Sequence, residues 1–244
     1  MKTANYGIAI PMANEEEGFA SFIESLKDAL DNVPGGKVYL VVDRASTDST
    51  PDLCSQLAQD DSRFVYVWAP ENRNVVDAYL RGFKEAFHAG HDYIVEMDGG
   101  GSHNPAALPA FIRALQEGNQ CAFGSRYING GSLNDSPLKR RVLSKFGSFL
   151  ARVLLGCPMR DVTSGYEAFT RPIMGKILSY SLRSKAHFYQ TELRYLLRKS
   201  DWVEVPIHYV SPSPRVSQNA IKNSLQCLFY YTFRRWSGKK DIIR

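Results

Sequence analysis

The sequence predicts a doubly wound α/β domain, in which helices cover both faces of a mostly parallel sheet. Short runs rich in β-branched and aromatic residues alternate with longer stretches of helical spacing through the first half of the chain. The 244 residues are 44% hydrophobic, which is enough for a large buried core. In such sheets ligands bind beyond the carboxyl ends of the strands, so the loops that follow the strands are the expected site.

The predicted elements follow in chain order. The expected strands are YGIAI (6–10), KVYLVVD (37–43), FVYVWA (64–69), YIVEMD (93–98), QCAFGS (120–125) and WVEVPIHYV (202–210). N-terminal signals predict helices that begin near Asn14, Ser49, Asn72, Pro105 and Pro137. The prolines of SPSPRVSQ (211–218) predict a loop. We therefore expect a main domain over residues 1–215 and an amphipathic, basic helical segment over 216–244.

Composition narrows the class of protein. Thirty basic and 25 acidic residues give a net charge of +5, and the basic residues cluster in LKRR (138–141) and FRRWSGKK (233–240). No DNA-binding motif accompanies this excess, which argues against nucleic acid as a partner. The four cysteines are far apart and have no metal-ligand spacing, which indicates reduced thiols in a cytosolic setting.

The apolar segments are too short to cross a membrane. The stretch that opens the chain, MKTANYGIAIPMANEEE, has too short an apolar run before its acidic residues to predict a signal peptide. LQCLFYYTF (225–233) falls short of the roughly 20 residues that a spanning helix needs. Residues 221–233 are apolar on much of their surface and basic residues follow, which fits a helix lying in a membrane interface. A helix packed on the domain is an equal alternative.

Three strand ends carry polar groups: IPMANEEE (10–17), VVDRASTDST (41–50) and VEMDGGGSH (95–103). The first strand is not followed by GxGxxG, and no Walker motif is present, which disfavours nicotinamide, flavin and P-loop enzymes. Glycines beside Asp98 allow a ligand to approach the backbone closely, and the carboxylate could hold a metal or a hydroxyl.

With these motifs the chain resembles the inverting nucleotide-sugar glycosyltransferases of the GT-A fold, in particular the dolichol- and polyprenol-phosphate mannose synthases. The resemblance continues in family order through FGSRYINGG (123–131), RDVTSGYEAFTR (160–171), FYQTE (188–192) and VEVPIHYV (203–210). It implies a GT-A fold and transfer of a hexose from a nucleotide diphosphate sugar to a polyprenyl phosphate. The expected setting is the cytosolic face of a membrane, with the membrane surface and a small membrane-anchoring subunit as candidate partners.

The resemblance also implies a donor site. The matching positions are Pro11, Asn14, Glu15, Asp43, Arg44, Asp98, Gly99, Gly100 and Arg215. Capping of the next helix is an alternative role for Asn14 and Glu15. Arg44 stands where the family has a second acidic residue, and Gln218 stands where close relatives have a lysine, so the nucleotide and the sugar stay open.

The family's Asp-x-Asp motif becomes Asp98, Gly99 and Gly100 here, which removes one of two metal-binding carboxylates. Mg²⁺ or Mn²⁺ could still bind through Asp98, with Ser102 as a second candidate ligand and with phosphates and waters completing the shell. Transfer without a metal is the alternative, in which backbone N–H groups of residues 99–101 and nearby arginines stabilise the leaving diphosphate.

Arg126, Arg140 and Ser144 match positions that the family uses for the lipid phosphate. A spacing of four places Arg140 and Ser144 on one helix face, and a guanidinium binds phosphate with two parallel hydrogen bonds. An anionic phosphate acceptor needs no general base. The expected catalytic residues are Asp98, Arg126 and Asp161, with Asp161 as the base if the acceptor is a hydroxyl; loop ordering is its alternative role.

Two other functions remain open from the sequence. One is a related transferase with a saccharide or a modified nucleic-acid base as the acceptor. The other is an inactive subunit that binds a nucleotide sugar.

Overall fold

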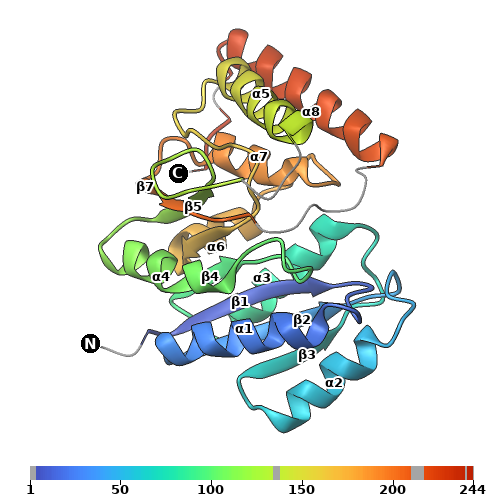
Figure 1. The fold of residues 1–244 in the computed structure, drawn as a ribbon. Helices are drawn as coiled ribbons and strands as arrows, with labels where there is room; N and C mark the ends of the chain where they lie inside the picture. The colour runs from blue at the N-terminus through green and yellow to red at the C-terminus, as the bar shows by residue number, and fades with distance from the viewer. Residues whose placement is uncertain (1–3, 134–137, 210–216, 240, 244) are drawn as a thin grey trace.

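The computed structural model describes residues 4–133, 138–209, 217–239 and 241–243, with only the backbone for residues 138–141 and 143. Seven strands form one sheet in the order β3-β2-β1-β4-β6-β5-β7 (Figure 1). Their bounds are β1 Tyr6–Met12, β2 Gly36–Val42, β3 Phe64–Trp68, β4 Tyr93–Glu96, β5 Cys121–Ser125, β6 Glu167–Thr170 and β7 Trp202–Pro206. The expected α/β class with a mostly parallel sheet is confirmed.

Helices cover both faces of the sheet, as a buried parallel sheet requires. One core lies under α1 (Phe19–Asn32), α2 (Thr50–Asp60) and α4 (Leu108–Gln116). The other lies under α3 (Val75–His88), α6 (Arg171–Leu178) and α7 (Phe188–Leu196). Strand side chains alternate between the two cores: Ile8 and Ile10 belong to the first and Ala9 to the second. This alternation explains why β1 and β2 are almost continuously apolar.

One strand was not predicted. β6 is only four residues long and runs antiparallel to both β4 and β5, whereas the pairings among the other named strands are parallel. Glu167, within this strand, breaks the apolar pattern that indicated the other strands. The strands β1, β2 and β4 run parallel to one another, so they end at a common edge of the sheet and the loops after them meet there.

Some helices begin later than the sequence signals suggested. α1 begins at Phe19 rather than near Asn14, because Asn14 has a left-handed backbone with φ of 58°, outside the helical region. α3 begins at Val75, where the Asn74 side chain accepts hydrogen bonds from the N–H groups of Val76 and Asp77. A short 3₁₀ turn, Pro105–Ala107, precedes α4.

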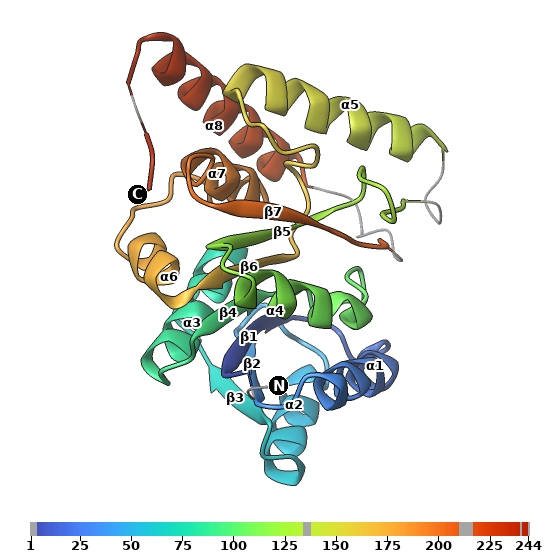
Figure 2. The same ribbon diagram turned by 90° about the vertical axis from the view of Figure 1, so that its left-hand side faces the viewer.

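Helices α5 (Leu138–Leu155) and α8 (Gln218–Trp236) pack side by side in an outermost layer beyond α7 (Figures 1 and 2). α8 falls within the predicted C-terminal segment, and Ser217 caps it by accepting a hydrogen bond from the N–H of Ala220. Within the described parts of the chain, no helix combines the length and the apolar character that crossing a bilayer demands.

Candidate active site

Asp98 lies just beyond β4 and is held on two sides. The buried hydroxyl of Tyr79, from α3, donates to its Oδ1. On the other side, Nε2 of His103 lies 3.5 Å from its Oδ2. The Asp98 side chain is 28% exposed, whereas that of His103 is 1% exposed. The carboxylate is therefore oriented from within the protein and remains accessible to a ligand.

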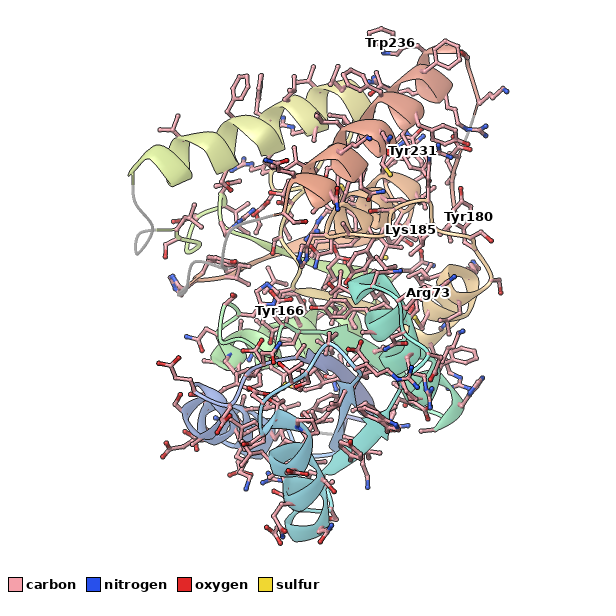
Figure 3. The ribbon with its side chains drawn as sticks, turned by 90° about the vertical axis from the view of Figure 1, so that its right-hand side faces the viewer. Arg73, Tyr166, Tyr180, Lys185, Tyr231 and Trp236 are labelled. Carbon is pink, nitrogen blue, oxygen red and sulfur yellow. The ribbon has the colours of Figure 1, made fainter. Side chains whose placement is uncertain are left out.

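His103 is a fixed, neutral support for this loop. Its Nδ1 accepts the backbone N–H of Asp98 at 3.1 Å, which places the ring proton on Nε2, toward the carboxylate. Burial lowers the pKa of His103, although the Asp98 charge opposes that shift. The ring of His103 also stacks on that of Tyr166, which Figure 3 labels, with 5.2 Å between the ring centroids. The sequence drew attention to His103 only as a polar residue beside the glycines.

The glycines of this loop have different physical roles. A Cβ at Gly99 would overlap the Met12 sulfur and lie 2.7 Å from the Pro11 carbonyl oxygen, so close approach to β1 requires glycine. Gly101 has a φ of 69°, which disfavours other residues. At Gly100 a Cβ would lie 3.1 Å from a carboxylate oxygen of Glu15. The position where the family has its second carboxylate is therefore bordered by the carboxylate of Glu15.

Asp98 and Glu15 could together hold a divalent cation. Burial raises the pKa of Glu15, and the charges of Asp98 and Asp48 raise it further, so a cation between these groups would relieve their repulsion. The described residues contain no group of three or more histidine, cysteine or acidic side chains suited to a metal. Two neighbouring carboxylates fit a cation that takes its other ligands from phosphates and waters. Ser102 is buried, and its role as a ligand stays a prediction.

The loops after β1 and β2 are tied together beside this carboxylate pair. Nδ2 of Asn14 donates to the carbonyl of Ala45 at 2.9 Å, and its Oδ1 accepts from the backbone N–H of Thr47 at 2.9 Å. Asp43, half-buried, accepts from the N–H of Ala45 at 2.9 Å. Asn14 thus shapes the predicted nucleoside slot through backbone contacts, and neither Asn14 nor Glu15 caps α1.

Replacing Asn14 with alanine is expected to lower the free energy of unfolding by about 2–3 kcal/mol, because it removes the hydrogen bonds between the loops and strains a left-handed backbone. Asn14→Gly removes the same bonds without the strain, so it should recover about 1 kcal/mol. Urea unfolding measures both variants. Equal stability of wild type and Asn14→Ala would show that these bonds do not hold the loops.

A second polar group follows β5. Nε of Arg126 lies 2.7 Å from Oδ2 of Asp161, and its Nη2 donates to Oδ1 of Asp161 at 2.9 Å and to the Thr163 hydroxyl at 2.7 Å. The Arg126 side chain is 7% exposed and that of Asp161 fully buried. Burial alone would raise the pKa of Asp161, but Arg126 outweighs it and lowers that pKa below the usual value. Asp161 is therefore an ionised partner of Arg126.

This group connects to α5 and to the Asp98 loop. The Tyr127 hydroxyl and the Ser144 Oγ are 2.9 Å apart, which joins the end of β5 to α5. Tyr209 lies between the two polar groups: its ring centroid is 6.2 Å from that of His103 and 5.6 Å from the Arg126 guanidinium carbon. The side chain of Arg140 and the whole of Arg215 lie outside the described residues, so their roles stay predictions.

Sequence reasoning missed a buried polar layer beneath the site. Glu96 and Glu167 face each other across β4 and β6, and both are fully buried. Arg194, from α7, forms an ion pair with Glu167, while Nε2 of Gln190 donates to Glu96 at 2.7 Å. Burial raises the pKa of Glu96, and the neighbouring Glu167 raises it further, which favours the protonated form of Glu96. A lone glutamate in a short strand gave no signal of this pairing.

The site as a whole has acidic groups beyond parallel strands and a buried arginine beside them, an arrangement suited to binding a charged substrate. The model of the family described as "Glycosyl transferase family 2" matches residues 7–178. The chain belongs to this family, which confirms the glycosyltransferase class that the motifs implied.

Two relatives share 33% identity with the chain. One, from Mycolicibacterium smegmatis, is named polyprenol monophosphomannose synthase; 240 residues align, 97% of this chain and 89% of the relative. The other, from Micrococcus luteus, is named undecaprenyl-phosphate mannosyltransferase; 203 residues align, 82% of each chain.

A solved structure supports the fold. Glucosyl-3-phosphoglycerate synthase from Mycobacterium tuberculosis, in complex with uridine diphosphate, superposes with a TM-score of 0.67 at 16% identity, over 94% of this chain and 80% of the synthase. The GT-A fold is thereby confirmed.

Proposed function

We propose that this chain transfers a hexosyl residue from a nucleoside diphosphate hexose to the phosphate of a polyprenyl phosphate. By analogy with the relatives the hexosyl residue is mannosyl, and the reaction takes place at the cytosolic face of a membrane. The 33% identity to the polyprenol monophosphomannose synthase carries the proposal, since it extends over 97% of the chain and so includes both polar groups. The names of the relatives offer no support for a small anchoring subunit, which is left out of the proposal.

In this proposal the donor occupies the edge where β1, β2 and β4 end. The linked loops after β1 and β2 shape the nucleoside slot, and the glycines after Asp98 make room for the diphosphate. Asp98 and Glu15 would hold a divalent cation, which would neutralise charge on the departing diphosphate. A related solved structure was determined with Mn²⁺ and uridine diphosphate, which supports a cation in general.

The acceptor phosphate approaches from the side of Arg126. Because a phosphate monoester is anionic at neutral pH, it can attack the anomeric carbon without a general base. This fits an Asp161 whose oxygens already accept hydrogen bonds from Arg126. The role of Asp161 is then to hold Arg126 in place beside the acceptor.

The decisive assay offers the purified protein several labelled nucleoside diphosphate hexoses, each with polyprenyl phosphate, with the corresponding polyprenol, or with a saccharide. Label is expected to appear on polyprenyl phosphate and to be absent from polyprenol. Efficient transfer to a hydroxyl would replace the acceptor in this proposal and make Asp161 the next residue to test as a base. No donor turnover with any acceptor would favour the inactive binding subunit.

Transfer is expected to depend on Mg²⁺ or Mn²⁺ more weakly than in relatives with both acids of the Asp-x-Asp motif. Glu15→Gln should weaken Mn²⁺ binding, measured by electron paramagnetic resonance with a nucleoside diphosphate present, by about tenfold. Glu17→Gln, at an exposed neighbouring residue, is the control. Loss of all activity on removing trace metal would contradict the weak dependence, and unchanged Mn²⁺ binding would remove Glu15 from the site.

A further inference from the structure

Residues 160–164, between α5 and β6, form an irregular loop that side chains of other elements hold in place. The two N–H groups at its start donate to the carboxylate of Glu204, in β7, both at 3.0 Å. Ser148, in α5, accepts the next N–H at 3.1 Å. From α7, the Thr191 hydroxyl donates at 2.7 Å to the carbonyl of the third residue, and Arg194 donates to the carbonyl of the last. Side chains of three elements thus satisfy five backbone groups and fix the loop.

This fixed loop places the hydroxyl of Thr163 beside Arg126. The hydroxyl oxygen accepts a hydrogen bond of 2.7 Å from Nη2 of Arg126. The side chain of Arg126 is 7% exposed and that of Asp161 is fully buried, whereas Thr163 is exposed. A ligand that approaches Arg126 from solvent therefore reaches the exposed hydroxyl of Thr163 as well.

The proton of the Thr163 hydroxyl is available to a ligand. The hydroxyl oxygen already accepts from Arg126, so the proton must point elsewhere. Oδ1 of Asp161 lies 3.3 Å from the hydroxyl oxygen, which is longer than the roughly 2.5–3.0 Å of an ordinary O–H···O bond. That carboxylate oxygen also accepts from Nη2 of Arg126 at 2.9 Å and from the backbone N–H of Thr163 at 3.1 Å. Turning the hydroxyl toward a ligand oxygen therefore gives up only a weak contact.

The guanidinium of Arg126 offers a second donor next to this hydroxyl. Its Nε and Nη2 bind Asp161 and Thr163, whereas Nη1 has no hydrogen-bond partner among the residues that the structure describes. Two adjacent donors, one of them cationic, suit two oxygens of one phosphate. We propose that the Thr163 hydroxyl donates a hydrogen bond to the phosphate of the polyprenyl acceptor, beside Nη1 of Arg126; the inference rests on the proposed function for the identity of that acceptor.

This contact selects a phosphate over an alcohol. A phosphate monoester presents several anionic oxygens, so it accepts from Thr163 and from Arg126 at the same time. A polyprenol presents one neutral oxygen, which would leave one of the two donors unpaired. Because threonine is neutral, its hydrogen bond holds the phosphate without adding a positive charge that would weaken the attack on the anomeric carbon.

The test compares Thr163→Val, which removes the hydroxyl and keeps the shape, with Thr163→Ser, which keeps the hydroxyl. Steady-state kinetics use farnesyl phosphate as the acceptor and the hexose donor that the wild type accepts. Thr163→Val is expected to raise the KM for farnesyl phosphate about tenfold, with the donor KM and donor hydrolysis unchanged, and Thr163→Ser should restore most of the loss. Thr170→Val is the matched control, because Thr170 lies opposite Tyr93 at the far edge of the sheet. Urea unfolding checks the fold of every variant.

A second background separates direct contact from support of Arg126. If Thr163 only positioned the guanidinium, Thr163→Val would have no effect once Arg126→Lys had removed that guanidinium. Direct contact predicts that Thr163→Val still raises the acceptor KM severalfold in the Arg126→Lys protein.

Failure of this contact and failure of the proposed function give different results. An unchanged acceptor KM in Thr163→Val, no recovery in Thr163→Ser, or an effect that vanishes with Arg126→Lys would overturn the contact. The proposed function would survive each of these results, because transfer to farnesyl phosphate by the wild type tests it separately. A wild type that glycosylates only hydroxyl acceptors would remove the function and the contact together.

Discussion

Asp98→Ala is expected to lower kcat/KM for sugar transfer by at least about a hundredfold and to leave the protein folded. The carboxylate is the accessible acidic group between the glycines and β4, and the loss of one such electrostatic contact to developing charge costs roughly 10²–10³ in rate. The same change leaves the buried Tyr79 hydroxyl without its acceptor, which should cost about 1–3 kcal/mol of stability. Steady-state kinetics and urea unfolding measure the two effects.

A double variant separates the effect of Asp98→Ala on activity from its effect on stability. Asp98→Ala combined with Tyr79→Phe removes the unpaired hydroxyl, so stability should return toward that of the wild type while activity stays lost. Asp52→Ala, at an exposed carboxylate of α2, is the control for a general loss of negative charge. Near-normal turnover of Asp98→Ala would remove Asp98 from the active site.

Arg126→Ala is expected to destabilise the protein by about 3–5 kcal/mol, because it leaves the Asp161 carboxylate buried and unpaired. This is a large share of the 5–15 kcal/mol that typically stabilises a domain. Arg73→Ala, which breaks the ion pair of an exposed arginine with Asp77, should cost less than about 1 kcal/mol. Similar losses of stability for the two variants would contradict the burial of the Arg126–Asp161 pair. Replacing Arg126 and Asp161 together with apolar residues should recover much of the loss.

The Arg126–Asp161 pair also predicts the direction of acid destabilisation. The pKa of Asp161 is lower in the folded than in the unfolded chain, so its contribution to stability is complete above about pH 4, the unfolded value, and declines as the pH falls through the folded value. Urea unfolding between neutral and acidic pH should show a smaller decline in the variant that lacks both charges. An equal decline in stability of the wild type and this variant would mean that other carboxylates dominate the acid destabilisation.

The acceptor role of Arg126 needs a variant that stays folded. Arg126→Lys keeps a positive charge beside Asp161 but loses the planar fork, so transfer to polyprenyl phosphate should fall about ten- to a hundredfold while donor hydrolysis is largely retained. Arg140→Lys should act in the same direction if it also holds the phosphate. Full transfer by both variants would place the acceptor phosphate elsewhere.

The described strands other than β6, and the polar loops that follow β1, β2 and β4, could be predicted because they depend on local signals. Apolar runs such as residues 37–43 indicate buried strands, and the polar residues that follow parallel strands must meet at one edge of the sheet. That is why Glu15, Asp43 and Asp98 could be assigned to one region before any geometry was available. The helix starts were less accurate, because side chains such as Asn14 bond to a distant loop.

The sequence by itself determined the fold class, the family and the order of the site loops, since hydrophobic periodicity and contiguous motifs are properties of the chain alone. Only the tertiary structure decided that Arg126 is held by Asp161, that Glu167 faces Arg194, and that Tyr79 and His103 orient Asp98. These contacts join residues from separate elements, and no spacing encodes them. Composition likewise indicated that residues 221–233 are apolar on much of their surface, but which side of α8 is covered depends on the elements that pack against it.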